Sequence, residues 1–85
     1  MNLILYSKPG CHLCEGLEEK LRSIATLDLN LEIRDITQND RDFEQYQYEI
    51  PVLYMQLKTG DWSVVPRPSP RCSIAQLEAL LLQAY

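Results

Sequence analysis

Two cysteines near the N-terminus, Cys11 and Cys14, are separated by two residues in the segment Cys-His-Leu-Cys. Residues three apart at the start of a helix lie on the same side of its first turn, so the two sulfurs can bridge. The unpaired N–H groups and the partial positive charge of a helix N-terminus stabilise a thiolate, which is the form that attacks a disulfide. The spacing therefore predicts thiol–disulfide exchange, with Cys11 as the attacking thiol and the less exposed Cys14 as the resolving thiol.

The residues on both sides of this pair predict the elements that position it. The apolar run 3–6 ends at Lys8-Pro9-Gly10 and predicts a buried strand. From Cys11 onward the period becomes helical, and an amphipathic helix of roughly four turns is predicted. Its apolar positions are Leu13, Leu17, Leu21, Ile24 and Ala25.

Apolar periodicity and turn residues predict the remaining elements. After the first helix we expect a strand over 29–34 and a short helix over 37–46, with Phe43 and Tyr46 on its buried side. A strand over 50–55 and its hairpin partner over 62–65 follow. A stiff loop over 66–71 then leads to a final helix over 74–84, which begins after the capping box of Ser73 and Gln76. The order β-α-β-α-β-β-α predicts an α/β protein with a four-stranded mixed sheet flanked by three helices. That is the minimal thioredoxin fold, and we expect residues 1–85 to form a single domain of this kind.

Pro51 opens the predicted third strand and is the second element of the candidate site. Thioredoxin-fold enzymes carry a proline at this point, with a cis bond before it and facing the cysteine pair. We therefore predict a cis Ile50–Pro51 bond, which would leave the backbone of Ile50 free to pair with an extended substrate strand. The alternative is an ordinary trans proline, because only about 5–6% of X–Pro bonds in folded proteins are cis.

The segment Tyr6–Cys14 resembles the active-site segment of glutaredoxins. It is most similar to small glutaredoxin-like proteins with a Cys-His-Leu-Cys centre, which also carry the Ile-Pro-Val-Leu strand found here at 50–53. The resemblance implies a thioredoxin fold and dithiol redox activity, and it names no physiological substrate.

The same resemblance implies two contacts with glutathione. Lys8, three positions before the first cysteine, matches a lysine that binds a glutathione carboxylate, although an exposed lysine is also commonly just solvated. The backbone N–H groups of Cys72 and Ser73 match those that hold the γ-glutamyl carboxylate at the start of the last helix. The chain departs from the family pattern here, because Pro70-Arg71 replaces a glycine pair and Ile74 replaces an acidic residue. Arg71 is either a substitute partner for the carboxylate or a surface charge.

Other residues carry weaker signals. A positively charged His12 would stabilise the Cys11 thiolate and make the disulfide more oxidising; the alternative is that His12 is a spectator. Cys72 is predicted to be a small buried hydrophobic residue, with a regulatory or glutathionylated thiol as the alternative. Three aromatic side chains are predicted to lie in the core or in a groove wall rather than to form a stacking platform; they are Phe43, Tyr54 and Trp62.

Composition and cysteine count weigh against several other function classes. With 8 basic and 12 acidic residues, a net charge of −4 argues against nucleic-acid binding. One Cys-x-x-Cys pair with a histidine trapped inside it does not supply four zinc ligands. We expect no metal and no tightly bound cofactor, with glutathione as a possible reductant. The alternative to an enzyme is a non-catalytic module that binds a protein partner or an iron–sulfur cluster held between two chains.

The sequence also predicts the setting in which the chain acts. The longest apolar run, 79–82, is far shorter than the ~20 residues of a membrane span, and the N-terminus lacks the features of a signal peptide. We expect a cytoplasmic monomer that acts on disulfide-containing proteins or glutathione mixed disulfides, without nucleic-acid or membrane partners.

Overall fold

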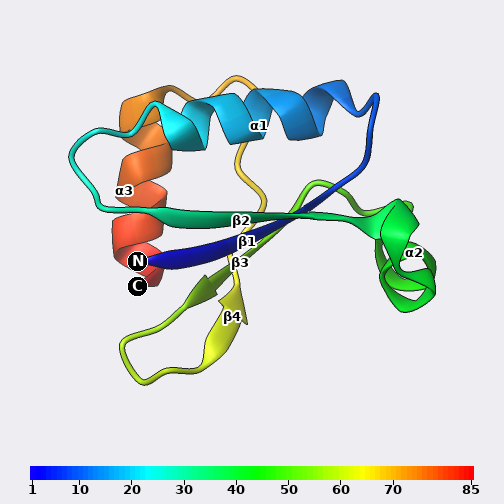
Figure 1. Cartoon of the computed structure of the whole chain (residues 1–85). Coiled ribbons are helices and arrows are strands. Elements are labelled where there is room, and N and C mark those ends of the chain that lie inside the picture. Colours follow the sequence, from blue (N-terminus) through cyan, green and yellow to red (C-terminus); the bar gives the residue numbers. More distant parts are fainter.

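A mixed four-stranded sheet forms the centre of the computed structural model, which describes residues 1–85 (Figure 1). The strand order is β2-β1-β3-β4, in which β1 is parallel to β2 and antiparallel to β3, and β4 is antiparallel to β3. The elements are β1 (Asn2–Ser7), α1 (His12–Arg22), β2 (Asn30–Asp35), a 3₁₀ turn (Ile36–Gln38), α2 (Asp40–Tyr46), β3 (Val52–Gln56), β4 (Trp62–Val64) and α3 (Ile74–Ala84). The predicted element order and the thioredoxin fold are confirmed.

The main core lies between the sheet and the two helices α1 and α3. Alternate residues of a strand point to opposite faces, so Leu3 and Leu5 of β1 point together toward these helices and are almost completely buried. They form one cluster with residues of β3, α1 and α3 and of the segments beside them: Leu17, Leu21, Ile24, Leu53, Met55, Val65, Leu77 and Leu81. This packing fixes the start of α1 above the end of β1.

A second, aromatic cluster lies on the opposite face of the sheet. Tyr6, Ile36 and Tyr46 are buried there, and the Tyr6 and Tyr46 rings lie 4.4 Å apart between centroids. The hydroxyls of Tyr46 and Tyr54 are 3.3 Å apart. Burial and this hydrogen bond raise the pKa of the Tyr46 phenol, so it stays neutral.

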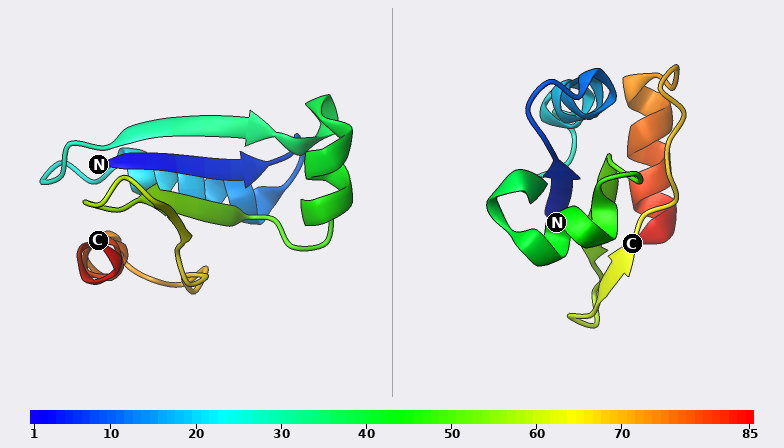
Figure 2. Two further views of the ribbon diagram at one scale, coloured as in Figure 1. Left: turned by 90° about the horizontal axis from the view of Figure 1, so that it is seen from below. Right: turned by 90° about the vertical axis from the view of Figure 1, so that its right-hand side faces the viewer.

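The helix α2 is short and lies at one end of the strands rather than across the sheet (Figure 2). Its N-cap is Asn39, whose side chain accepts a hydrogen bond from the Asp42 N–H. The predicted burial of Phe43 is wrong, since its side chain is 39% exposed. Because α2 lies at the end of the strands, the core covers Tyr46 at the C-terminal end of the helix and does not reach Phe43. Trp62 is 45% exposed on β4 at the edge of the sheet and lines a hollow together with Tyr54, in agreement with the predicted groove wall.

The first helix is about one turn shorter than its sequence pattern predicts. It ends at Arg22, and the backbone N–H of Ser23 is shared by the carbonyl oxygens of Glu19, Lys20 and Leu21. Ile24 remains buried although it lies beyond the helix, which explains why apolar spacing alone extended the prediction. None of the helices has the length and apolar character to cross a membrane.

We expect α3 to contribute much of the stability through Leu77. This side chain is completely buried, whereas Leu82 on the same helix is 52% exposed. Leu77→Ala is expected to lower the free energy of unfolding by about 2–5 kcal/mol, because it removes buried methyl groups and leaves a cavity. Leu82→Ala is the matched control and is expected to change it by less than ~0.5 kcal/mol. Urea denaturation measures both values, and equal losses would contradict this account of the core.

Candidate functional site

The two cysteines lie where β1 passes into α1. After β1 the chain turns at Gly10, whose φ of +81° is a conformation that residues with a Cβ rarely adopt. Cys11 is the N-cap of α1, and its sulfur accepts a hydrogen bond from the backbone N–H of Cys14 at 3.3 Å. Serine, threonine, aspartate or asparagine usually supplies that acceptor. Here a sulfur atom satisfies one of the unpaired donors of the helix.

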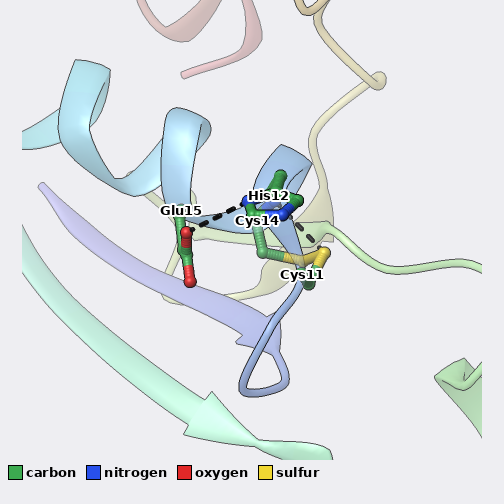
Figure 3. Close-up of polar contacts among 4 residues, drawn as sticks. All are labelled: Cys11, His12, Cys14 and Glu15. Atoms are coloured by element: carbon green, nitrogen blue, oxygen red, sulfur yellow. Dashed lines mark hydrogen bonds and ion pairs between the residues drawn. A yellow bond between two sulfur atoms is a disulfide. The ribbon is translucent and has the colours of Figure 1, made fainter.

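Cys11 and Cys14 form a disulfide bond, as Figure 3 shows. Their Cα atoms are 5.3 Å apart, within the range that a disulfide requires. The two ends differ in accessibility, because Cys14 is completely buried and Cys11 is half-buried. The prediction that this pair lies within bridging distance, with Cys14 the less exposed member, is confirmed. One sulfur of the disulfide is therefore accessible from outside the protein and the other is not.

His12 points away from the protein between the two cysteines. Its side chain is 94% exposed, and its Nδ1 lies 3.6 Å from a carboxylate oxygen of Glu15 (Figure 3). A positive charge on His12 would thus face the Glu15 carboxylate as well as the sulfur. The predicted tuning of the thiolate by His12 stays a prediction.

The Ile50–Pro51 peptide bond is cis, which confirms the prediction from the sequence. The backbone of Ile50 is not free, however, and that expectation is wrong. Its N–H donates to the carbonyl oxygen of Tyr46 at 3.1 Å, and its own carbonyl accepts a hydrogen bond from Arg67 Nη2 at 2.9 Å. The N–H and carbonyl groups of Ile50, with which a substrate strand would pair, are thus hydrogen-bonded to Tyr46 at the end of α2 and to the Arg67 side chain.

The predicted glutathione contacts are only partly available in this structure. Lys8 is exposed in the turn before Cys11. The backbone N–H of Cys72 donates to the carbonyl oxygen of Ser69 at 3.0 Å, and that of Ser73 donates to Gln76 Oε1 at 2.8 Å within the capping box. These two donors are therefore occupied by the protein's own turn and cap, because a stiff proline-containing loop replaces the glycine pair.

A cleft of about 170 Å³ lies beside the disulfide, between α1 and the loop that leads to α3. We call it the redox cleft; its lining residues are His12, Leu13, Gly16, Leu17, Lys20, Pro51, Arg67, Pro68, Ser69, Pro70 and Cys72. It brings together three residues predicted for the site, namely His12, Pro51 and Cys72. Cys72 is half-buried and packs against the main core as well.

Two residues of the redox cleft, Lys20 and Arg67, were missed by reasoning from the sequence. Lys20 follows the polar face of α1 and so resembles an ordinary surface lysine, but its Nζ donates to the carbonyl oxygen of Pro70 across the cleft at 2.7 Å. Arg67 stands between Pro66 and Pro68. Flanking prolines that hold one cation in a stiff loop are the signal that could have identified it. No group of three or more His, Cys, Asp or Glu side chains is placed to hold a metal ion.

Comparison with known proteins assigns the family. The family described as "Glutaredoxin-like domain (DUF836)" matches residues 2–82, and the chain therefore belongs to this glutaredoxin-like family. The crystal structure of a structural-genomics target, protein XcR50 from X. campestris, is similar with a TM-score of 0.60 and 26% identity, over 98% of this chain and 97% of that one. Thioredoxin 1 from Thermosipho africanus TCF52B shares the fold with a TM-score of 0.64 and 19% identity, over 99% and 93% of the two chains. No curated protein sequence matches significantly.

The capping role of Cys11 predicts a difference between two variants that both lack the disulfide. Cys11→Ser keeps a good N-cap acceptor, whereas Cys11→Ala leaves the Cys14 N–H without a side-chain partner. Under reducing conditions the alanine variant is expected to be less stable than the serine variant by about 0.5–2 kcal/mol. Urea denaturation followed by circular dichroism measures the difference, and equal midpoints would show that a side-chain acceptor at position 11 does not stabilise α1.

Proposed function

We propose that this glutaredoxin-like protein is a thiol–disulfide oxidoreductase in which Cys11 is the attacking thiol and Cys14 the resolving thiol. The observation that supports the proposal best is the asymmetry of the pair: Cys11 is half-buried and accepts an N–H hydrogen bond, and Cys14 is completely buried. The N-terminal end of the α1 macrodipole favours negative charge at the Cys11 sulfur. A purely structural disulfide would not need one accessible sulfur in that position.

The exchange runs through a mixed disulfide. In the reduced protein the Cys11 thiolate attacks one sulfur of a substrate disulfide; the substrate S–S bond breaks, a Cys11–substrate bond forms, and the departing thiolate takes up a proton. Cys14 then loses its proton and attacks Cys11 Sγ, which forms the Cys11–Cys14 disulfide and releases the second substrate thiol. Two electrons pass from the protein to the substrate. Two molecules of a thiol such as glutathione supply them again and become a disulfide.

Disulfide-containing proteins are the substrates that we favour over glutathione mixed disulfides. The N–H groups of Cys72 and Ser73 already have acceptors within the chain, so they do not offer glutathione a free pair of donors. Lys8 remains exposed in the turn before Cys11 and is the residue through which glutathione could still be held as a reductant. We place this activity in the cytoplasm, where dithiol enzymes are kept reduced.

A trapping experiment tests the assignment of the two cysteines. Cys14→Ser removes the resolving sulfur, so a mixed disulfide between Cys11 and a substrate peptide is expected to accumulate and to be visible by mass spectrometry. Cys11→Ser is the matched control, which keeps Cys14 and removes the accessible sulfur; it is expected to form no adduct at Cys14 because that side chain is completely buried. An adduct on Cys14, or none on Cys11, would contradict the assignment.

Redox titration of the unaltered protein in glutathione buffers tests the activity itself. We expect Cys11 and Cys14 to interconvert between dithiol and disulfide, with a potential in the range of thioredoxin-fold enzymes, about −270 to −120 mV. A pair that stays in one state across that range would rule out the proposed exchange.

A further inference from the structure

The side chain of Arg67 lines two neighbouring hollows of the surface. One is the redox cleft. The other, which we call the β4 groove, has a volume of about 270 Å³ and is lined by Leu17, Glu49, Pro51, Val52, Leu53, Val64, Val65, Pro66, Arg67 and Pro68. The two hollows share four residues: Leu17, Pro51, Arg67 and Pro68. Cys11 itself lines neither hollow, but its neighbour His12 lines the redox cleft. A polypeptide that lies in these hollows while its disulfide meets Cys11 would therefore contact Arg67.

The redox cleft is cationic although the chain as a whole has a net charge of −4. Lys20 and Arg67 line it, and no carboxylate does. Neither cation forms an ion pair with Asp or Glu, since the ion pairs of the protein involve His12, Arg22 and Arg34. Glu15 faces His12, and Glu18 is paired with Arg22. Glu49 lines the β4 groove together with Arg67 but forms no ion pair with it.

Both cations are held in place by neutral acceptors that leave their charge uncompensated. Arg67 Nη2 donates to the Ile50 carbonyl, and Lys20 Nζ donates to the Pro70 carbonyl. A guanidinium has five N–H donors and an ammonium three, so each keeps donors for a ligand. Pro66 and Pro68 restrict the backbone on both sides of Arg67, which reduces the conformational freedom that binding would have to remove.

We propose that Arg67 and Lys20 bind a carboxylate side chain of the substrate, so that the protein prefers disulfides flanked by aspartate or glutamate in a polypeptide. This inference rests on the proposed function and names its substrate class. Arg67 occupies one of the two acceptor positions of the Ile50 carbonyl, and a guanidinium is well matched to a carboxylate, which it can bind through two parallel hydrogen bonds. In this proposal, Arg67 and Lys20 recognise the substrate by the charge of its side chain rather than by its backbone.

The test compares two peptides that contain the same cysteines in a disulfide and differ only in the residues beside them, glutamate in one and glutamine in the other. For the unaltered protein, kcat/KM for the acidic peptide is expected to exceed that for the neutral one about two- to fivefold, the range of an exposed ion pair. The preference is expected to shrink in 0.5 M salt, because the screening length falls below roughly 5 Å.

Charge reversal at Arg67 tests the residue. Arg67→Glu is expected to abolish or invert the preference, and Arg67→Lys is expected to keep part of it, because charge remains and the planar fork is lost. Arg41→Glu, the same charge change at an exposed residue of α2 that lines neither hollow, is expected to retain the preference. Circular dichroism spectra establish that each variant is folded before its rates are compared.

The outcomes separate this inference from the proposed function. If the unaltered protein reduces both peptides equally, or if Arg67→Glu and Arg41→Glu change the preference alike, the inference is overturned while the oxidoreductase activity stands. If Arg67→Glu alters only the rate with glutathione disulfide, the carboxylate belongs to glutathione and the preference for acidic polypeptides is ruled out. If neither peptide nor glutathione disulfide is reduced, the proposed function itself has failed.

Discussion

The start of α1 is the constraint on which the rest of the structure depends. A helix leaves its first backbone N–H groups without partners, and in this protein a sulfur atom accepts the hydrogen bond from one of them. That single contact places Cys11 at the cap, sets Cys14 one turn further on, and directs the positive end of the helix toward the pair. Gly10 permits the turn that delivers the sulfur, and the packing of Leu17 and Leu21 against the sheet holds the helix there.

The second feature of the site is that both backbone polar groups of Ile50 are hydrogen-bonded within the chain. The cis Pro51 lies beside the redox cleft as the fold requires, but the end of α2 and the Arg67 side chain bind the two polar groups of Ile50. A loop that carries three prolines connects the last strand to the last helix. The same loop therefore presents Arg67 both to the Ile50 carbonyl and to the redox cleft.

Local sequence patterns were sufficient to predict the helices and strands. They failed to predict the burial of side chains whose surroundings come from distant segments of the chain. The apolar run of β1, the alternation in β2 and the capping box at Ser73 correctly located their elements. Phe43 was misplaced because its exposure depends on where α2 lies relative to the sheet, and helical spacing contains no information about that position. Similarly, Ile24 is buried by the core although α1 ends two residues earlier. The spacing of apolar residues shows which side chains are buried, whereas the end of a helix is set by its backbone hydrogen bonds.

The sequence by itself determined the fold and the position of the cysteine pair within it. Two cysteines three residues apart at a strand-to-helix junction, and a proline at the start of the third strand, are local features whose consequences follow from backbone geometry. Only the tertiary structure decided which groups of the site remain open. The contacts Arg67–Ile50 and Lys20–Pro70 join residues 17 and 50 positions apart. Such contacts depend on how the loop before α3 packs against α1 and β3, so no short-range pattern contains them.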